Sequence, residues 1–150
     1  MAIEINGIAH LMLTVSDFER CRPFYARLLE FMGLVPLIDA DGAFYCIGGR
    51  TAVGIMACAD EHRGERFVQQ RVGLHHACFR ARAREDVDAL HGLLQDMGAN
   101  IVHPPEEGPW APGYYSVLFE DPDGTRLEMN HVPGKGHLEE SGSTQPEKTS

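Results

Sequence analysis

Short segments in which apolar and polar residues alternate predict β-strands in the first part of the chain, over residues 8–15, 34–39, 42–48 and 51–58. The segment between the first two has helical spacing and ends at Gly33, with one apolar face formed by Phe24, Tyr25, Leu28, Leu29 and Met32. Because Pro23 lacks an N–H, we expect the regular helix to begin near Cys21 or Arg22, after a turn at Ser16-Asp17.

The same order recurs after a polar linker over residues 59–72. Strands are expected over residues 73–80, from 101, and over 114–119 and 125–130, with the last two joined by a type I turn at residues 121–124. A helix ends at Gly98, and its apolar face consists of Val87, Leu90, Leu94 and Met97. The tail over 134–150 is rich in Gly, Ser, Thr, Pro and Glu, which is typical of disorder.

An internal repeat relates the two halves. The segment LLEFMG at residues 28–33 recurs as LLQDMG at 93–98, with four of six residues identical. His10 and His76 lie at equivalent positions of the first strand of each half, 66 positions apart. We therefore predict an α+β fold of two βαβββ modules, at about 7–58 and 73–131, within a single domain over residues 1–133.

Composition excludes several classes of function. The 150 residues include 13 Lys and Arg against 22 Asp and Glu, giving a net charge of -9, and there is no basic stripe to bind nucleic acid. No apolar run approaches the roughly 18 residues of a membrane span, and no export signal opens the chain, so we expect a soluble, cytoplasmic protein with no membrane partner. Four cysteines lack a Cys-x-x-Cys spacing and are interpreted as reduced core thiols, with a catalytic cysteine as the alternative: Cys21, Cys46, Cys58 and Cys78.

Strand parity places metal-ligating side chains on faces that do not point to the core. His10 lies opposite the apolar face of its strand, His76 shares a face with Cys78, and Glu128 lies opposite Leu127 and Met129. If a pseudo-twofold arrangement brings the equivalent strands together, two imidazoles and one carboxylate form a set that binds Fe(II) or a similar ion. The alternative is that each is an ordinary polar strand residue. His75 is a flanking residue, and five further histidines are expected in solvent: His62, His91, His103, His131 and His137.

Four segments together resemble the vicinal oxygen chelate superfamily, which includes glyoxalase I, extradiol dioxygenases and bleomycin resistance proteins. They are HLMLTV from His10, FYARLL from Phe24, GLHH from Gly73 and FEDPDGTRLE ending at Glu128. The resemblance covers residues 7–133 and implies an open, barrel-like cup around Fe(II), Mn(II), Ni(II) or Zn(II), with ligands mapping to His10, His76 and Glu128. It also implies that two neighbouring oxygens of a small metabolite chelate the metal, and that the protein is a homodimer.

Departures from the family patterns bear on the reaction. Glyoxalase I and the related epimerase usually have a fourth ligand where this chain has Gly54, and fosfomycin resistance enzymes usually have Tyr and Thr where it has Leu118 and Met12. The resemblance therefore slightly favours a dioxygenase over a lyase or isomerase. Candidates for its acid–base groups are Tyr114, Tyr115 and His75. A metal-free binding protein of the bleomycin resistance type is the alternative function. Trp110 lies in the loop over residues 104–113, where we expect it to be either a substrate wall or a packing residue.

Overall fold

The computed structural model describes residues 2–138, which divide into two compact units, one ending at Arg66 and the other beginning at Phe67. The first unit contains β1 (His10–Val15), α1 (Phe18–Phe31), β2 (Val35–Ala40), β3 (Ala43–Gly48), β4 (Thr51–Ala57) and the 3-10 turn η1 (Asp60–His62). The second contains β5 (Ala77–Arg80), α2 (Arg84–Asp96), β6 (Asn100–Glu107), β7 (Tyr115–Glu120), β8 (Arg126–His131) and the 3-10 turn η2 (Gly136–Leu138). This confirms the α+β prediction of two βαβββ modules.

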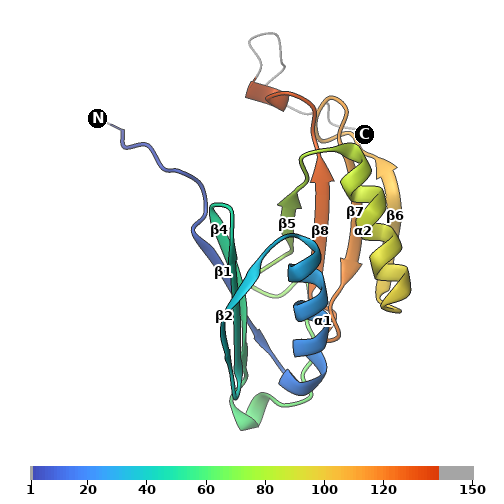
Figure 1. Ribbon diagram of the computed structural model, residues 1–150. Coiled ribbons are helices and arrows are strands. Elements are labelled where there is room, and N and C mark those ends of the chain that lie inside the picture. Colours follow the sequence, from blue (N-terminus) through green and yellow to red (C-terminus); the bar gives the residue numbers. More distant parts are fainter. Residues whose placement is uncertain (1, 139–150) are drawn as a thin grey trace. The chain divides into compact units, whose positions relative to one another are not determined.

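Each unit is built on an open sheet of four strands (Figure 1). The strand order is β1-β4-β3-β2 in the first sheet and β5-β8-β7-β6 in the second. In both, the first strand pairs in parallel with the last, and the other pairings are antiparallel. The last strand of each module is therefore internal, with the first strand on one side and the third on the other.

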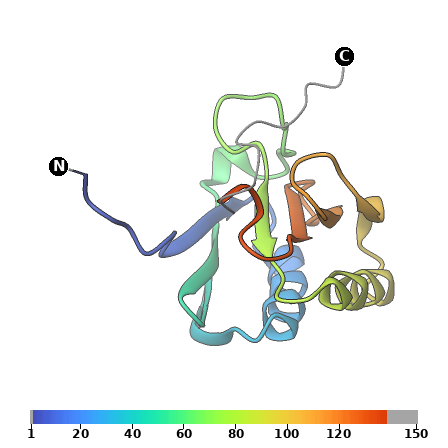
Figure 2. The ribbon, with the colours of Figure 1, turned by 90° about the horizontal axis from the view of Figure 1, so that it is seen from above.

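One face of each sheet packs on the helix of its own module, and we call the opposite face the outer face. In the first unit the helix side buries alternating strand residues such as Val53 and Ile55 together with Leu28 and Leu29 of α1. In the second unit α2 lies alongside its sheet (Figure 2). It buries Val87, Leu90 and Leu94 together with the strand residues Val117, Phe119 and Leu127. Among residues 2–138 no helix has the length and apolarity to cross a bilayer.

Helix α1 begins earlier than the sequence pattern predicts. Asp17 caps it, because its carboxylate accepts a hydrogen bond from the Arg20 N–H at 3.0 Å, and the first helical residue is Phe18. Pro23 consequently lies inside the helix and removes one backbone hydrogen bond. Burial of Cys21, Phe24 and Tyr25 on either side of the proline offsets that loss, which local propensity alone does not reveal.

Strand bounds in the second unit also differ from the prediction. The segment expected to be strand from residue 73 is irregular up to His76, and β5 begins only at Ala77. Strand β6 continues through Pro104 and Pro105, which were expected in a loop. It is an edge strand with two register shifts, and an edge tolerates residues without an N–H. Of the predicted disordered tail, 136–138 form η2, and 139–150 lie outside the described residues.

The side chain of Asp121 stabilises the turn between β7 and β8. Oδ1 of Asp121 accepts hydrogen bonds from the N–H groups of Asp123 and Thr125, both at 2.9 Å. The Gly124 N–H donates to the Asp121 carbonyl at 2.9 Å, and Gly124 has a φ of +87°, which favours glycine. This turn fixes the register in which Leu118 of β7 faces Glu128 of β8.

Candidate functional site

The outer face of the second sheet gathers His76 and Glu128. Glu128 lies on the internal strand β8, between Cys78 of β5 and Leu118 of β7 in the register of the sheet. It is only 9% exposed, although it does not point toward α2. Nε2 of His76 lies 3.4 Å from Oε2 of Glu128. A largely buried carboxylate is costly unless it is paired, and His76 provides one partner.

Tyr114 provides the other partner of the carboxylate. Its hydroxyl donates a hydrogen bond to Oε1 of Glu128, so the two carboxylate oxygens have different neighbours. Tyr114 directly precedes β7, where the Gly108 N–H donates to its carbonyl at 3.0 Å and closes the loop after β6. Burial and the hydrogen bond to Glu128 both raise the pKa of the Tyr114 hydroxyl, so the phenol keeps its proton and stays a donor.

A chain of close polar contacts leads from Gln69 through His75 to His76. Nδ1 of His75 lies 3.3 Å from the amide Nε2 of Gln69 and 2.8 Å from Nδ1 of His76. These contacts orient the imidazole of His76, and its other ring nitrogen, Nε2, faces Glu128.

This pair passes a simple test for metal binding. Nitrogen and oxygen ligands at about 2.0–2.2 Å from a tetrahedral ion lie about 3.4 Å apart, the distance that separates Nε2 of His76 from Oε2 of Glu128. Among residues 2–138 no group of three or more His, Cys, Asp or Glu side chains is gathered to hold an ion.

Cys78 differs from the predicted core thiol. All four cysteines are free, and Cys21 and Cys46 are buried as expected, but Cys78 is exposed on the outer face beside Glu128. Partial desolvation of its thiol and the negative charge of Glu128 raise the pKa of Cys78 to about 12. Parity had placed Cys78 with His76, but the proximity of the carboxylate depends on the pairing of β5 with β8, which is not local in sequence.

Tyr115 does not join this group. It lies on the helix side of β7, where its hydroxyl donates to Oδ1 of Asp88 at 2.6 Å and the Arg84 guanidinium lies 3.6 Å from the centre of its ring. The hydrogen bond to Asp88 raises the pKa of the Tyr115 hydroxyl. The structure therefore brings Tyr114 and His75 to the His76–Glu128 pair, and it separates Tyr115 from them.

His10 belongs to the first unit and is exposed on the outer face of the first sheet. Its ring meets the ring of Tyr45 edge to face, with 6.5 Å between centroids. Tyr45 was not identified as a candidate from the sequence. The alternation of side chains along β3 could have placed it on the outer face. Three other histidines have polar partners: His62 contacts Glu65, His103 contacts the Pro104 carbonyl, and His131 contacts the Ala81 carbonyl, which is 50 positions away in sequence.

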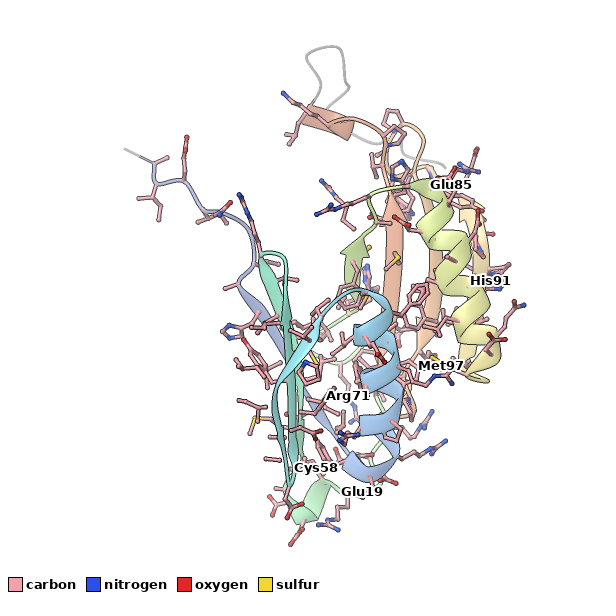
Figure 3. The ribbon with its side chains drawn as sticks, in the orientation of Figure 1. Glu19, Cys58, Arg71, Glu85, His91 and Met97 are labelled. Atoms are coloured by element: carbon pink, nitrogen blue, oxygen red, sulfur yellow. The ribbon has the colours of Figure 1, made fainter. Side chains whose placement is uncertain are left out.

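A cavity of about 460 Å³ lies elsewhere in the first unit, at the end of β1 opposite to His10. Its lining includes Glu19 and Cys58, which lie at the same end of the unit (Figure 3). None of the candidate site residues lines it. Trp110, for which the sequence left a substrate wall and a packing role open, is 63% exposed and lies close to Gly108 in the loop after β6.

Comparisons with known proteins match the family resemblance. The model of the Glyoxalase/Bleomycin resistance protein/Dioxygenase superfamily matches residues 7–129. The chain is 27% identical over 122 residues to the uncharacterized protein YqjT of Bacillus subtilis, covering 80% of this chain and 94% of that protein. It is 29% identical over 126 residues to the metallothiol transferase FosB of Shouchella clausii, covering 84% and 80% respectively. A crystal structure from Bacillus halodurans, assigned as a glyoxalase, aligns with a TM-score of 0.74 and 26% identity over 85% of this chain and 96% of that chain.

The raised pKa of Cys78 predicts slow alkylation of its thiol in metal-free protein. A rise from 9.0 to about 12 lowers the thiolate population at neutral pH about a thousandfold. The rate of reaction with iodoacetamide, followed at Cys78 by peptide mass spectrometry, should still increase with pH at pH 10. Glu128→Gln removes the neighbouring negative charge and should increase the rate at pH 8, whereas Glu120→Gln, which changes a carboxylate bonded to Arg126, should not. A plateau in the rate below pH 9.5 would contradict this account.

Proposed function

The chain belongs to the superfamily of glyoxalases, bleomycin resistance proteins and dioxygenases, and on this basis we propose that it is a metal-dependent enzyme. Its substrate is a small metabolite that presents two neighbouring oxygens, and its metal ligands are His10, His76 and Glu128. The ion is Fe(II), Mn(II), Ni(II) or Zn(II), which imidazole and carboxylate ligands suit. Such an ion supplies Lewis acidity that stabilises negative charge on the substrate oxygens.

The observation that carries this proposal is the arrangement of the His76–Glu128 pair. Nε2 of His76 lies 3.4 Å from Oε2 of Glu128, and the contact between Nδ1 of His76 and Nδ1 of His75, at 2.8 Å, orients the ring. A cation between the two groups satisfies both. His10 is the proposed third ligand because it occupies in the first module the position that His76 occupies in the second. Each lies two residues before an outer-face pair, Met12–Gly54 in the first sheet and Cys78–Glu128 in the second.

Tyr114 and His75 are proposed as positioning residues. Tyr114 holds Oε1 of Glu128, which leaves Oε2 directed at His76, so the carboxylate binds through one oxygen. His75 fixes the ring orientation of His76. Partners of this kind commonly change metal affinity by about 10–100-fold when they are removed.

Three protein ligands leave several coordination positions for a substrate and a second reactant, which favours a dioxygenase acting on a catechol-like chelate. Gly54 supports this because it contributes no fourth ligand. The 29% identity to a metallothiol transferase makes thiol addition the second candidate, although Leu118 and Met12 depart from the fosfomycin pattern. A lyase or isomerase and a metal-free binding protein of the bleomycin resistance type are the remaining alternatives.

Removing a proposed ligand should abolish stoichiometric metal binding. His10→Ala, His76→Ala and Glu128→Ala should each bind less than about one tenth of an equivalent of divalent metal in equilibrium dialysis, because two remaining ligands bind weakly. The exposed His62, which bonds to Glu65 in the same unit as His10, offers a control, and His62→Ala should bind one equivalent. Full metal retention in Glu128→Ala would contradict the assignment.

The positioning residues should behave differently from the ligands. His75→Ala and Tyr114→Phe should still reach one equivalent of metal at saturation, but with an affinity about 10-fold lower or more, measured by chelator competition. An affinity equal to that of the wild type in both variants would show that neither residue supports the ligands.

Oxygen dependence should separate the candidate reactions. With Fe(II) or Mn(II), the enzyme should consume O₂ and cleave a catechol, measured as oxygen uptake together with ring-cleavage absorbance. Without O₂ it should leave methylglyoxal–thiol adducts and a 2-methyl acyl-CoA unchanged. Anaerobic turnover of either of these compounds would assign the chain to the lyases and isomerases, and thiol addition to an epoxide would assign it to the thiol transferases.

We also propose that the protein is a homodimer. The outer face of the first sheet exposes large apolar residues, including Met12 at 40%, Ile47 at 38% and Met56 at 50%, and exposed apolar patches commonly mark interfaces. Light scattering at micromolar concentration should give a dimer mass. A monomer mass at that concentration would contradict the proposed dimer.

A further inference from the structure

The two modules have the same strand register but different outer-face residues at one position. In the second sheet, Glu128 of β8 pairs with Cys78 of β5 and Leu118 of β7. In the first sheet, Gly54 of β4 pairs with Met12 of β1 and Tyr45 of β3. Gly54 is thus the internal counterpart of Glu128. The first module lacks a carboxylate where the second has one.

The space above Gly54 is filled. A Cβ atom at this position would lie 2.7 Å from Cδ2 of Tyr45, 2.8 Å from Sδ of Met12 and 3.0 Å from the Phe44 carbonyl oxygen. Real Cβ atoms do not approach other atoms so closely, because packed interiors leave no room for an additional methyl group. The Tyr45 ring therefore covers the position from which a ligand side chain would extend. The same ring meets His10 edge to face.

The strand residues on the outer face of the first sheet are uncharged. The register places three residues of each strand on the outer face of the first sheet, and none is Asp, Glu, Lys or Arg. These residues are His10, Met12, Thr14, Val35, Ile38, Ala40, Ala43, Tyr45, Ile47, Ala52, Gly54 and Met56. Charged side chains of this sheet lie elsewhere: Asp39 is on the helix side, where it pairs with Arg22 of α1.

We propose that Tyr45 occupies the place of a second carboxylate, so that His10 is the only ligand from the first module. This inference rests on the proposed function, because it concerns the metal site to which His10 contributes. Tyr45 acts as a positioning residue in two ways. Its ring excludes a side chain at position 54, and its edge contact orients the imidazole of His10. On the side of the first module, a substrate bound beside His10 then meets a phenol and a thioether instead of a carboxylate.

The first test is a double-mutant cycle on stability. Gly54→Ala should lower Tm by about 3 °C or more in the wild-type background, because its methyl group meets the Tyr45 ring. In a Tyr45→Ala background the same change should cost less, since the ring is absent. Gly92→Ala is the control, because a Cβ at this α2 position meets nothing within 4 Å and should not lower Tm. Equal losses from Gly54→Ala in both backgrounds would overturn the claim that Tyr45 fills this space.

The second test adds a ligand. Gly54→Glu combined with Tyr45→Ala should bind Co(II) about tenfold more tightly than wild type and should change the visible absorption of bound Co(II), because a second carboxylate reaches the ion. Gly54→Glu alone should have a lower Tm and no gain in affinity. Tyr45→Phe, which keeps the ring, should match wild type in Tm and in the Co(II) spectrum.

The outcomes distinguish this inference from the function on which it rests. A gain in affinity for Gly54→Glu alone, or wild-type affinity and spectrum in a folded double variant, would overturn the role of Tyr45. Full Co(II) affinity in His10→Ala would instead overturn the proposed metal site. In that case the stability cycle would still report on the packing of Tyr45 over Gly54.

Discussion

The parallel pairing between the first and the last strand of each module is the constraint on which the site depends. A parallel pair needs a crossover, and α1 and α2 with their following strands provide it. The helix covers one face of its sheet, which leaves the outer face open. On that face the pairing of β5 with β8 sets Cys78 beside Glu128 and brings His76, just before β5, within 3.4 Å of the carboxylate. The arrangement of these side chains on the outer face thus follows from the parallel pairing of the first strand with the last.

Much of this arrangement was predictable because it is local or repeated. Alternation along each strand identified the faces of His10 and Glu128, and the repeat identified two modules of equal order. Alternation also distinguishes Tyr114 from Tyr115, since neighbouring residues of a strand point to opposite faces. The structure separates them in this way, with Tyr114 at Glu128 and Tyr115 at Asp88.

Other features depend on contacts between distant segments and were not predictable. Pro23 is accommodated inside α1 because its neighbours are buried, which a rule for isolated helices does not include. The high pKa of Cys78 arises from burial of its thiol and from a carboxylate 50 positions away in sequence. The link from Gln69 through His75 to His76 depends on an irregular segment where a regular strand was expected. In each case a tertiary contact outweighs the local pattern.

The difference between the two modules has an electrostatic consequence. A divalent ion held by two neutral imidazoles and one carboxylate keeps a net positive charge, whereas a second carboxylate at position 54 would neutralise it. Bound ions are commonly the largest local charges in a site and determine which proton states are stable around them. With Tyr45 and Met12 above Gly54, the proposed site favours a substrate that binds through deprotonated oxygen.

The most direct test of the metal assignment is X-ray absorption spectroscopy of the protein loaded with one equivalent of Zn(II). The account predicts a first shell of nitrogen and oxygen only, at about 2.0–2.2 Å, with the outer-shell scattering of two imidazoles. Cys78 lies on the same face as Glu128 and offers the main competing ligand. A sulfur scatterer at about 2.3 Å, or the signal of a single imidazole, would contradict the account.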